Sequence, residues 1–571
     1  MRIEKVEISK FRSIENGSFY FNNITAIVGQ NNSGKSALMR ALNSFFNPSA
    51  ELKFYIDETN LYTTKRTIPR ITIIFEDVPN NINYTPFLFN GKLTVKQEYN
   101  KSRKRLEYHV LNNLDFQIAT EDFVNQMNSD INFILIPTER GVKYENQEEF
   151  SILKKLLNVY FATHTARRDT LSPKVQQAFN YLKNNALKKV SKGVEDKYLA
   201  TKGFKIEIDS RYPINYELFI NDLAIKIIEE NKSFYLSECG SGIQSLVAIS
   251  IYRYLASFKN TNYIIGIEEP EINLHPQAQK ELIFALMDEV ENEGIQLIFT
   301  THSTVLIDEL DHTKIVLIRK ENDLNRSFKT TIHQIDSNFW IRHNLQVIQY
   351  NKFHKFRNSE FFFANHVMVT ESPTDSEVFR HLLKSKNIII EKYGISVLEL
   401  SGVKSLKYAY YLLKELEIPK TIIIDKDFFF DYQYGSKANS RYGSGFFNYK
   451  NQFRNELLIN ELFNDRTERT LIEQLLTTNH SQALEHTLKF DVLCMKYNME
   501  MDLVASNTAC NLIYNKLNIQ LTDRNTQFIL INHEENLKRL DLLLHVIDNL
   551  QHQNLPNSYK SLIRRFKKIT Q

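Results

Sequence analysis

The sequence is poor in cysteine, with only Cys239, Cys494 and Cys510 in 571 residues and no CxxC pair among them. This scarcity argues against a disulfide framework and a structural zinc site, and it favours a reduced, cytoplasmic setting. No apolar run is long enough to span a bilayer, and the N-terminus lacks the charged and apolar regions of a secretory signal. We therefore expect neither secretion nor insertion into a membrane.

The chain also lacks an excess of charge of one sign, because 71 basic and 67 acidic residues leave a net charge of only +4. A protein that is polybasic as a whole is thereby excluded, whereas local basic faces are not. What the chain does have is length. Its 571 residues, 42% of them hydrophobic, are enough to bury a large core and predict two or three domains.

The most specific motif is Gly29-Gln30-Asn31-Asn32-Ser33-Gly34-Lys35-Ser36, which fits the phosphate-binding pattern G-x-x-x-x-G-K-[ST]. It follows the apolar run 24–28 and opens a helix-like stretch at 37–46, which is the order of strand, loop and helix that this pattern requires. A chance glycine-rich turn is therefore the weaker interpretation. The residues predicted to bind ATP are Gly29, Asn31, Asn32, Ser33, Gly34, Lys35 and Ser36. Lys35 would reach the β and γ oxygens, and the Ser36 hydroxyl would ligate Mg²⁺.

Short strands are predicted around this loop, at Arg2–Phe11, Arg70–Glu76, Lys92–Tyr99 and Ile131–Ile136. The phosphate-binding loop is expected at the edge of their sheet. From about residue 148 to 200 the pattern turns helical and polar with one apolar stripe. Such a stripe predicts a helical insertion that packs on its own domain or on a second subunit.

Polar residues also follow later strands of this first domain. A Gly/Ser loop at 237–244 opens an apolar helix and is a second candidate phosphate cradle. The strand that starts at Tyr263 ends in Glu268 and Glu269; the first acid would hold Mg²⁺ through water, and the second would polarise the attacking water. His302 follows the strand 295–300 and is a candidate sensor of the γ-phosphate, although a loop histidine without that role is the alternative.

These four features resemble, in order and approximate spacing, the ABC-type ATPases of chromosome maintenance and recombination repair. In that class the signature loop of one subunit closes over the ATP of the other. The resemblance therefore implies a homodimer in which Ser241 and Gly242 approach the partner's nucleotide, and it leaves higher oligomers open. The loop here departs from the usual LSGG form, so the detailed contact of Ser241 stays open as well.

The second half of the chain alternates strands and helices after an aromatic, basic connector at 341–365, and this alternation predicts a small parallel sheet. Glu371 ends the first of these strands, and Asp375 opens the helix that follows. Asp425 and Asp427 form a D-x-D at the end of the strand that begins at Thr421. Carboxylates at adjacent strand ends converge in one crevice, where Mg²⁺ or Mn²⁺ would neutralise them and activate water against a phosphodiester.

A glutamate at one strand end with D-x-D at another is the Toprim pattern. An ABC-type ATPase followed by a Toprim domain closely resembles the OLD (overcoming lysogenisation defect) family of endonucleases, over nearly the whole chain. The implied fold class is α/β, with an ABC-type P-loop ATPase domain at 1–340, its helical insertion serving dimerisation, and a Toprim domain with C-terminal helices at 366–571. By resemblance, two divalent metal ions would be bound by Glu371, Asp375, Asp425, Asp427, Glu500 and Asp502. For the last two, an ordinary acidic helix start is an equal alternative.

The OLD family also carries a late lysine that stabilises the transition state of cleavage. Lys538 is the candidate here, with Arg539 and Lys404 as alternatives. Family members act largely in bacterial defence against phage, alone or with a helicase or a retron reverse transcriptase and its DNA product. The residues do not choose among these settings.

Contacts to DNA are predicted separately from its cleavage. The segments 350–357 and 560–568 are basic with interleaved aromatic residues and suit phosphate contacts, although a solvated helix face explains the second equally well. The segment 435–451 is expected to be a loop near the metal ions. The sequence thus predicts an ATP-regulated, metal-dependent DNA endonuclease. The alternatives are an ATP-gated DNA-binding scaffold and a repair ATPase that does not cut DNA, whereas a topoisomerase is disfavoured because no strand-attacking tyrosine domain is evident.

Overall fold

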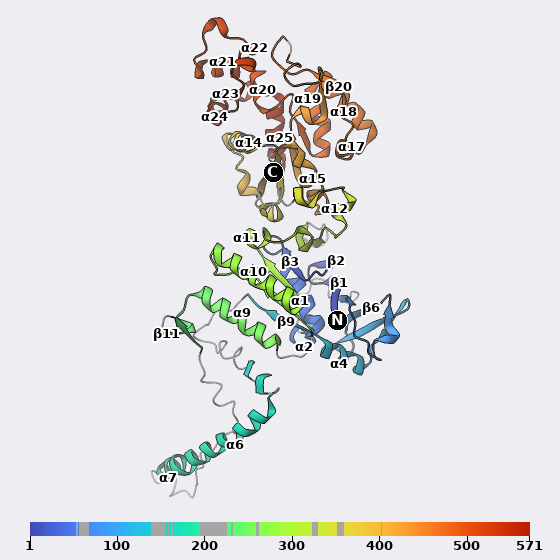
Figure 1. The fold of residues 1–571 in the computed structure, drawn as a ribbon, viewed down its shortest axis with the longest axis vertical. Helices are drawn as coiled ribbons and strands as arrows, with labels where there is room; N and C mark the ends of the chain where they lie inside the picture. Colours follow the sequence, from blue (N-terminus) through green and yellow to red (C-terminus); the bar gives the residue numbers. More distant parts are fainter. Residues whose placement is uncertain are drawn as a thin grey trace. The chain divides into compact units, whose positions relative to one another are not determined.

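The computed structural model describes residues 1–52, 55, 68–138, 156–157, 159–161, 164–194, 225–229, 232–257, 262–321, 329–350, 359–400, 402–441 and 443–571 (Figure 1). The chain forms two compact units. The first comprises Met1–Ile27, Asn32–Glu309 and Ile318–Ile332, and the second comprises Val28–Asn31, Leu310–Leu317 and His333–Gln571.

A thirteen-stranded sheet organises the N-terminal region, in the order β8-β7-β6-β4-β1-β2-β15-β14-β3-β13-β12-β9, with β5 beside β6. Its strands are β1 (Arg2–Phe11), β2 (Ile14–Tyr20), β3 (Ile24–Val28), β4 (Arg70–Glu76), β5 (Leu88–Phe89), β6 (Lys92–Asn100), β7 (Arg105–Asn112), β8 (Asp115–Ile118), β9 (Ile131–Ile136), β12 (Asn262–Glu268), β13 (Gln296–Thr301), β14 (Ile315–Glu321) and β15 (Lys329–His333). The strands predicted at 2–11, 70–76 and 131–136 are confirmed with the same bounds.

The position of the phosphate-binding loop in this sheet differs from the prediction. Its strand β3 lies between β14 and β13 in the interior of the sheet, so the expectation of an edge position was wrong. All five residues of β3 are buried, as a strand with neighbours on both sides requires. The neighbour β14 starts almost 290 residues after β3 in the chain, at Ile315, and no local pattern around the loop announces that pairing.

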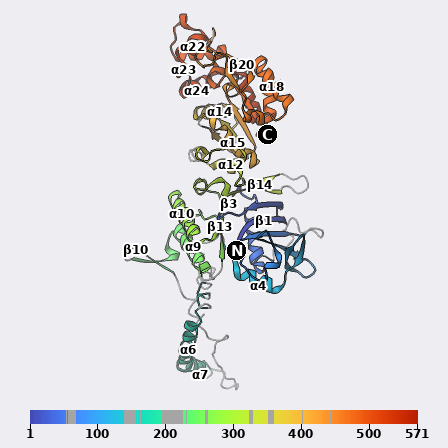
Figure 2. The ribbon, with the colours of Figure 1, turned by 45° about the vertical axis from the view of Figure 1, so that its right-hand side comes forward.

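Helices cover the sheet. They are α1 (Lys35–Phe46), α2 (Pro48–Glu51), α4 (Glu121–Asp130), α9 (Ser241–Ser257), α10 (Pro276–Glu293) and α11 (Thr304–Ile307). The buried face of α1 packs on β9, β12 and β13, and α9 also contacts β9 and β12. Figures 1 and 2 both show α9 and α10 side by side. These contacts place the start of α1 beside the carboxyl ends of β12 and β13.

The predicted insertion is helical where the structure describes it. It contains α6 (Thr165–Leu182), a π-helical turn (Lys183–Leu187) and α7 (Lys188–Val194). Most of 148–163 and all of 195–200 lie outside the described residues. A short antiparallel hairpin follows, formed by β10 (Lys226–Glu229) and β11 (Lys232–Tyr235).

The predicted parallel sheet of the second unit is confirmed. Its strands are β16 (His366–Thr370), β17 (Ile395–Glu399), β18 (Lys420–Ile424) and β21 (Val492–Cys494), in the order β17-β16-β18-β21, all parallel. Every residue of β16 and β21 is buried, as parallel strands covered by helices on both faces should be. The parallel arrangement brings the ends of β16, β18 and β21 to one edge.

The second unit is otherwise mostly helical. Its longer helices are α14 (Pro373–Ser385), α15 (Leu406–Glu415), α18 (Arg466–Thr478), α19 (His480–Thr487), α21 (Asn507–Lys516), α24 (Leu540–Asn549) and α25 (Asn557–Ile569). Shorter helices are α12 (Phe339–Arg342), α16 (Lys426–Phe429), α17 (Leu457–Leu462), α20 (Met499–Val504), α22 (Thr526–Asn532) and α23 (Glu534–Leu537). An antiparallel pair, β19 (Phe430–Tyr432) and β20 (Tyr449–Phe453), follows α16. One apolar core joins α14, α20, α21, α24 and α25 to the sheet.

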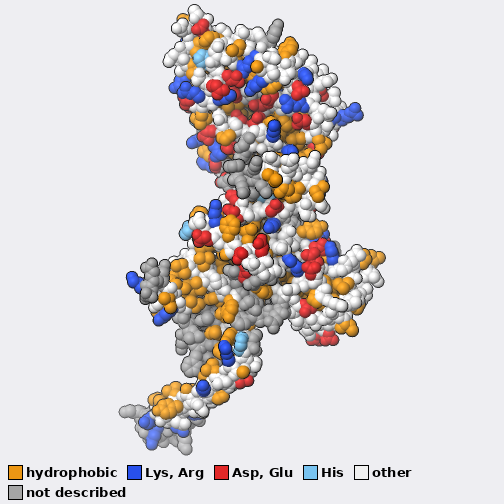
Figure 3. All heavy atoms as spheres, in the orientation of Figure 1, with side chains coloured by type: hydrophobic (Ala, Val, Ile, Leu, Met, Phe, Trp, Pro, Cys, Tyr) orange, Lys and Arg blue, Asp and Glu red, His pale blue; other side chains and the backbone are white. Residues whose placement is uncertain are grey.

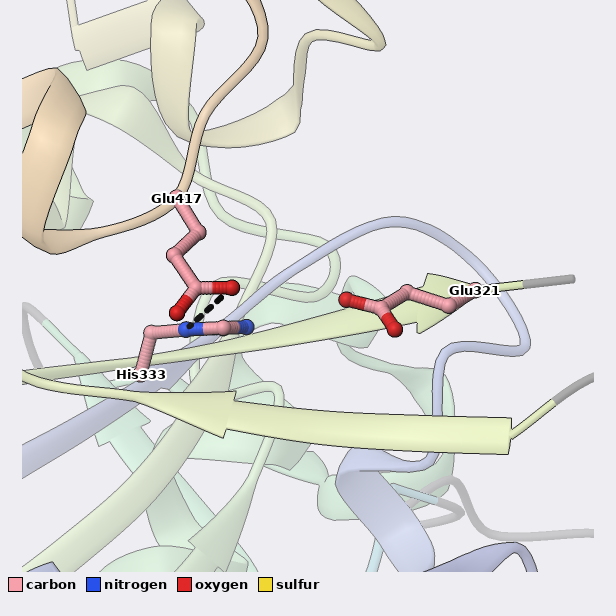
Figure 4. A group of neighbouring side chains, drawn as sticks. All are labelled: Glu321, His333 and Glu417. Atoms are coloured by element: carbon pink, nitrogen blue, oxygen red, sulfur yellow. Dashed lines mark ion pairs between the residues drawn. The ribbon is translucent and has the colours of Figure 1, made fainter.

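The connector predicted at 341–365 is partly regular, because it contains the end of α12 and a 3₁₀ turn at Ser359–Phe363, while 351–358 lie outside the described residues. Just before it, His333 lies with Nδ1 4.0 Å from Oε2 of Glu417, as Figure 4 shows. No helix among the described residues combines the length and apolarity that crossing a bilayer demands.

Candidate functional sites

The phosphate-binding loop has the backbone that nucleotide binding needs. Gly29, Asn32 and Gly34 all have positive φ angles, of 151°, 58° and 114°. At Gly34 a Cβ atom would lie 2.7 Å from Oγ1 of Thr330, which itself donates hydrogen bonds to Oγ of Ser13 and to the carbonyl of Ser33. Both the φ angle and the space at this position therefore require glycine.

The helix that follows the loop begins without a side-chain cap. Gly34 occupies the N-cap position of α1 in a left-handed conformation, and no side chain accepts hydrogen bonds there. The first backbone N–H groups of α1 are thus open to an anion. Lys35 is buried at this end, and its burial lowers the pKa of the ammonium group to about 8, although Glu269 and Glu271 oppose that shift.

Glu268 and Ser36 meet beside the loop. Glu268 ends β12 and is only 6% exposed. Burial raises the pKa of its carboxyl group, and this shift is opposed by Arg40, by the backbone of Thr138 and by a hydrogen bond with the side chain of Ser36. A hydroxyl and a carboxylate in direct contact, next to a helix N-terminus, match the donor set that holds Mg²⁺ on a nucleotide.

Glu269 and His302 lie at the ends of adjacent parallel strands. Glu269 has a φ of 47°, and its N–H donates to the carbonyl of Thr300 at 3.0 Å. Its Oε1 lies 3.7 Å from Nε2 of His302. Burial and the charge of Lys35 lower the pKa of His302, whereas Glu269 raises it. The neutral imidazole is therefore favoured beside the phosphate-binding lysine.

Glu271 completes this arrangement and had no assigned role in the sequence prediction. Its Oε1 accepts a hydrogen bond from the backbone N–H of His302 at 2.7 Å. Burial raises the pKa of the Glu271 carboxyl group, whereas this bond and a hydrogen bond from the Thr301 side chain lower it. Glu271 thus fixes the loop that carries His302. Its place in the string Glu268-Glu269-Pro270-Glu271 was the only sequence signal for it.

The signature loop is placed separately. Ser241 is the first residue of α9 and is exposed. A Cβ atom on Gly242 would lie 2.8 Å from the carbonyl oxygen of Asn273, so this glycine permits close packing of α9 on the loop after β12. The exposed position of Ser241 is open to a second molecule.

Gln30, the second residue of the phosphate-binding loop, belongs to the second unit together with Val28, Gly29 and Asn31. Its Nε2 donates to the carbonyl of Phe363 at 2.8 Å and to Oδ1 of Asn365 at 2.7 Å. Asn365 in turn donates to the carbonyl of Tyr393 at 2.9 Å, just before β17. These three bonds connect Gln30 with the start of the four-stranded sheet inside the second unit.

The acids predicted at the strand ends of that sheet come together. Glu371 follows β16 directly, and Asp425 and Asp427 both follow the end of β18. Asp375 lies in the first turn of α14, where it forms a capping box: its Oδ2 accepts from the N–H of Ser372 at 3.0 Å, and its own N–H donates to Oγ of Ser372.

Mutual repulsion contributes to the raised pKa values of Glu371 and Asp425. Burial, followed by the charges of Asp427, Asp375 and Glu500, raises the pKa of Glu371 to about 7. Burial and the same surrounding acids raise the pKa of Asp425 well above its usual value. Burial raises the pKa of Asp375 to about 6. Oε2 of Glu371 is buried and has no hydrogen-bond partner among the described residues. A cluster of acids with such an orphaned oxygen fits a divalent cation.

Glu500 and Asp502 differ, although both lie on α20. Glu500 interacts electrostatically with Glu371, Asp375 and Asp425. Asp502 is 1% exposed and accepts three hydrogen bonds: from the N–H groups of Lys496 and Tyr497 at 3.0 and 2.9 Å, and from the Ser558 hydroxyl at 2.6 Å. These bonds occupy both Asp502 oxygens, whereas Glu500 faces the cluster.

Two lysines lie within electrostatic range of the acids. Lys538, the candidate from the sequence, lowers the pKa of Glu500 but is ion-paired to Glu535 at 3.1 Å. Lys437, which sequence reasoning missed, lowers the pKa of both Glu371 and Glu500. It lies in the segment 435–451 that was expected near the metal ions, and that expectation was the only signal for it.

The other residues and segments predicted to act in cleavage or DNA binding have different partners or lie outside the described residues. Arg539 is ion-paired to Asp541 at 2.8 Å, and Lys404 lies in a 3₁₀ turn before α15. Residues 351–358 and 139–155 lie outside the described residues. In the basic segment 560–568, Arg565 is ion-paired to Asp491, so α25 is partly neutralised. Figure 3 shows acidic side chains gathered on one face of the second unit, with Lys and Arg around them.

Comparison with known proteins agrees with this geometry. Residues 1–168 and 131–307 match the AAA ATPase domain family, together more than half of the chain. Residues 362–427, which contain Glu371, Asp375, Asp425 and Asp427, match the Overcoming lysogenization defect protein-like TOPRIM domain. The predicted α/β fold class, an ATPase domain followed by a Toprim domain with a parallel sheet, is thereby confirmed.

Relatives match across both parts. The OLD nuclease of Thermus scotoductus is 23% identical over 453 residues, 74% of this chain and 82% of that protein. The Old nuclease of Escherichia phage P2 is 24% identical over 476 residues, 75% of this chain and 78% of that protein. Endonuclease GajA of Bacillus cereus is 23% identical over 371 residues, 59% of this chain and 53% of that protein. With an AAA ATPase domain joined to an OLD-like Toprim domain, this chain belongs to the OLD nuclease family.

Proposed function

We propose that this protein is an ATP-regulated DNA endonuclease that depends on a divalent metal ion. The observation that carries the proposal is the cluster of Glu371, Asp425, Asp427 and Glu500 at one edge of a parallel sheet, with an orphaned Glu371 oxygen. Burial and the surrounding acids raise the pKa of Glu371 and of Asp425, so ionising these carboxyl groups is costly without a cation, and we infer that their function requires one. The relatives named nuclease and endonuclease support the reaction class.

The metal ligands we infer are Glu371, Asp425, Asp427 and Glu500, with Asp375 beside them. A bound Mg²⁺ or Mn²⁺ supplies Lewis acidity and a water of lowered pKa. Asp502 belongs to the predicted set of metal ligands, but its oxygens accept hydrogen bonds from the turn after β21. We infer that it supports α20, and through α20 the position of Glu500.

Lys437 and Lys538 are the cations available to neutralise charge on the scissile phosphate. Of the two, Lys437 acts on Glu371 as well as on Glu500, and its side chain lies 5.0 Å from the centroid of the Phe447 ring. The ring and the 3.8 Å contact with Glu534 hold the lysine without neutralising it completely. We infer that Lys437 serves the reaction alongside or in place of Lys538.

In the ATPase domain, Lys35 would bind the β and γ phosphates, while Ser36 and Glu268 would hold Mg²⁺. Glu269 would accept a proton from the attacking water, and His302 would donate a hydrogen bond to the γ-phosphate. The exposed Ser241 and the closely packed Gly242 lie where a second copy of the chain would approach, so we propose a homodimer with ATP between subunits. Higher oligomers follow if further contacts form.

The cellular role we propose is defence against phage, which rests on membership of the OLD family and not on any residue of this chain. A helicase, or a retron reverse transcriptase with its DNA product, would be the partner if the protein does not act alone. The proposed endonuclease activity includes both nicking of one strand and cleavage of both strands.

The decisive experiment is incubation of supercoiled plasmid with purified protein and Mg²⁺ or Mn²⁺, with and without ATP, beside Asp427→Ala. We expect nicked or linear product that requires metal and is lost in the variant, while ATP hydrolysis is retained. DNA binding without cleavage under every condition would instead support an ATP-gated scaffold. Equal cleavage by Asp427→Ala would contradict the assignment of the Toprim acids.

A further inference from the structure

A cavity of about 760 Å³ lies next to the metal-ligand cluster in the second unit. Its walls come from the turn after β18, the turn after β21, and the starts of α19 and α25, and they include Lys426, Lys496, His480 and Asn557. Lys426 stands between Asp425 and Asp427 in the chain, and its N–H donates to the carbonyl of Tyr497 at 3.0 Å. The cavity and the cluster therefore share the same two turns.

The cavity carries positive charge. Lys426 and Lys496 both line it, and the only carboxylate among its lining residues is Asp502. The three hydrogen bonds to Asp502 occupy its oxygens and turn them toward the protein backbone and Ser558. His480 adds no charge at neutral pH, because burial lowers its pKa to about 4. A ligand in this cavity therefore meets two ammonium groups and one satisfied carboxylate.

The two lysines are held in different ways. Lys426 is 9% exposed, and its Nζ donates to the carbonyl of Leu476 at 2.8 Å while lying 5.3 Å from the centroid of the Tyr449 ring. Lys496 is exposed, with Nζ 5.5 Å from the centroid of the Tyr497 ring. A buried ammonium group with one carbonyl partner keeps two donors for an anion. The exposed lysine marks the entrance.

The start of one helix adds donors. α25, of 13 residues, begins at Pro556 and Asn557 without a side-chain cap, and both residues line the cavity. Asn557 donates from Nδ2 to Oγ of Ser481 at 2.5 Å, also at the wall. Leu476 and Leu555 also line the cavity but are only 2% and 3% exposed, so its walls are mainly polar. Two ammonium groups and further donors in a polar cavity suit a small ligand that carries a phosphate.

We propose that this cavity binds a phosphomonoester nucleotide, with its phosphate between Lys426 and Lys496 and its sugar and base beside the half-buried Pro556. The inference rests on the proposed function, because the nucleotide would be the phosphorylated end of a DNA strand beside the cleavage site. A free nucleotide has the same chemistry and is the other source. The volume fits a mononucleotide, and lysine ammonium groups favour a doubly charged terminal phosphate over a singly charged internal one.

The test uses the full-length Lys35→Ala chain in EDTA, so that neither the ATPase site nor metal-dependent cleavage contributes. Calorimetry would compare thymidine 5′-monophosphate with thymidine, and a short oligothymidylate with and without a 5′-phosphate. We expect the phosphate to improve binding about tenfold, as loss of charge-assisted hydrogen bonds predicts. Tighter binding of the phosphorylated oligonucleotide than of the mononucleotide assigns a strand end; the reverse assigns a free nucleotide.

The matched variants are Lys496→Ala and Lys414→Ala. Both remove one exposed lysine, but Lys414 lies on α15, pairs with Glu461 at 3.5 Å and is not part of the cavity. Lys496→Ala keeps the backbone N–H that donates to Asp502. It should weaken thymidine 5′-monophosphate binding about tenfold, Lys496→Arg should restore most of it, and Lys414→Ala should have no effect. Equal binding of thymidine and its monophosphate, or an unchanged Lys496→Ala variant, overturns the proposal.

Failure of this inference and failure of the proposed function are distinguishable. Asp427→Ala should abolish plasmid cleavage and leave nucleotide binding in EDTA unchanged. A chain that binds thymidine 5′-monophosphate but never cuts DNA keeps the cavity assignment and loses the endonuclease. A chain that cuts DNA but does not distinguish thymidine from its monophosphate keeps the endonuclease assignment and loses the cavity assignment.

Discussion

The hydroxyl group of Tyr432 donates a hydrogen bond to Oδ2 of Asp427 at 2.9 Å. Tyr432 lies on β19 opposite Tyr449 on β20, and the two rings stack with their centroids 5.3 Å apart. The hairpin thus holds the tyrosine rigidly against the D-x-D turn. The hydrogen bond fixes the direction of one Asp427 oxygen, and because the carboxylate is planar it fixes the direction of the other oxygen as well. Partners of this kind tune the affinity of a carboxylate for its metal ion.

Tyr432→Phe should therefore weaken binding of Mn²⁺ by about tenfold, because it removes the hydroxyl group and keeps the stacked ring. Calorimetric titration of Mn²⁺ and the metal dependence of plasmid cleavage would both measure this change. Tyr434→Phe is the matched control, since Tyr434 is 56% exposed two residues further along the chain. An unchanged affinity in Tyr432→Phe would show that the bond does not orient a ligand.

The pKa of Glu371, raised to about 7 by burial and by its acidic neighbours, makes stability depend on pH. A glutamic acid in an unfolded chain titrates near 4.3, so the folded protein binds the proton more tightly than the unfolded one. The free energy of unfolding must then fall as the pH rises from about 4.3 to about 7. In EDTA, the melting temperature should fall across this window, and Glu371→Gln should flatten the fall.

Addition of Mg²⁺ at pH 8 should reverse that loss, because the ion binds the ionised carboxylates of the folded state only. Glu377→Gln is a suitable control, since Glu377 lies on α14 outside the acidic cluster. Melting temperatures that rise with pH in EDTA, or that fall as steeply in Glu371→Gln, would contradict the proposed repulsion.

Much of both sites was predictable because their signals are local. The phosphate-binding loop, Glu371 and the D-x-D are short strings at the ends of apolar strands, and the parallel pairing of β16 with β18 brings Glu371 and the D-x-D to one edge of their sheet. Tyr432, by contrast, is one of 28 tyrosines. Its role depends on the pairing of β19 with β20, 17 residues further along, which no motif announces.

Contacts between distant segments explain the other differences. The loop strand β3 is interior because β14, from far down the chain, pairs beside it. Asp502 is held by Ser558, 56 residues later, and that hydrogen bond makes it unlike Glu500 on the same short helix. From the sequence, both acids looked equally suited to a metal ion. Pairing and packing at long range decide which acid faces the cluster.

Substitution of these two acids should separate their roles. Glu500→Gln should weaken metal binding and cleavage strongly while leaving the melting temperature unchanged or higher, because it removes a repelling charge. Asp502→Asn leaves one buried N–H group without its acceptor and should lower the free energy of unfolding by about 1–3 kcal/mol. Denaturant unfolding and Mn²⁺ titration of both variants would check this. Equal losses of metal affinity without instability in Asp502→Asn would assign it as a ligand.

Gly34→Ala should abolish nucleotide binding. The new methyl group would lie 2.7 Å from Thr330 Oγ1 at a φ of 114°, so the loop must move or strain. Gly91→Ala is the control, because its φ is also positive, at 75°, but its methyl group would meet nothing within 4 Å. Binding of a fluorescent ATP analogue would compare them. Normal binding by Gly34→Ala would mean that the loop accommodates nucleotide in another conformation.

Gln30 offers a way to separate ATP turnover from its effect on cleavage. Its side-chain amide donates to Phe363 and Asn365, which belong with it to the second unit, while backbone groups of the loop remain to bind phosphate. Gln30→Ala should keep ATP hydrolysis within about twofold, since the lost bonds lie outside the phosphate cradle. The ratio of cleavage rates with and without ATP should move toward one, whichever direction the native response takes.

Asn365→Ala should produce the same effect, because Asn365 connects Gln30 to the carbonyl of Tyr393 before β17. If both residues act through this one connection, the double variant should be no worse than either single variant. Cleavage rates at saturating ATP, measured for the four proteins together, form the complete cycle. Additive losses would mean that the two side chains act independently, and an unchanged ATP response in both single variants would mean that nucleotide state reaches the Toprim acids by another route.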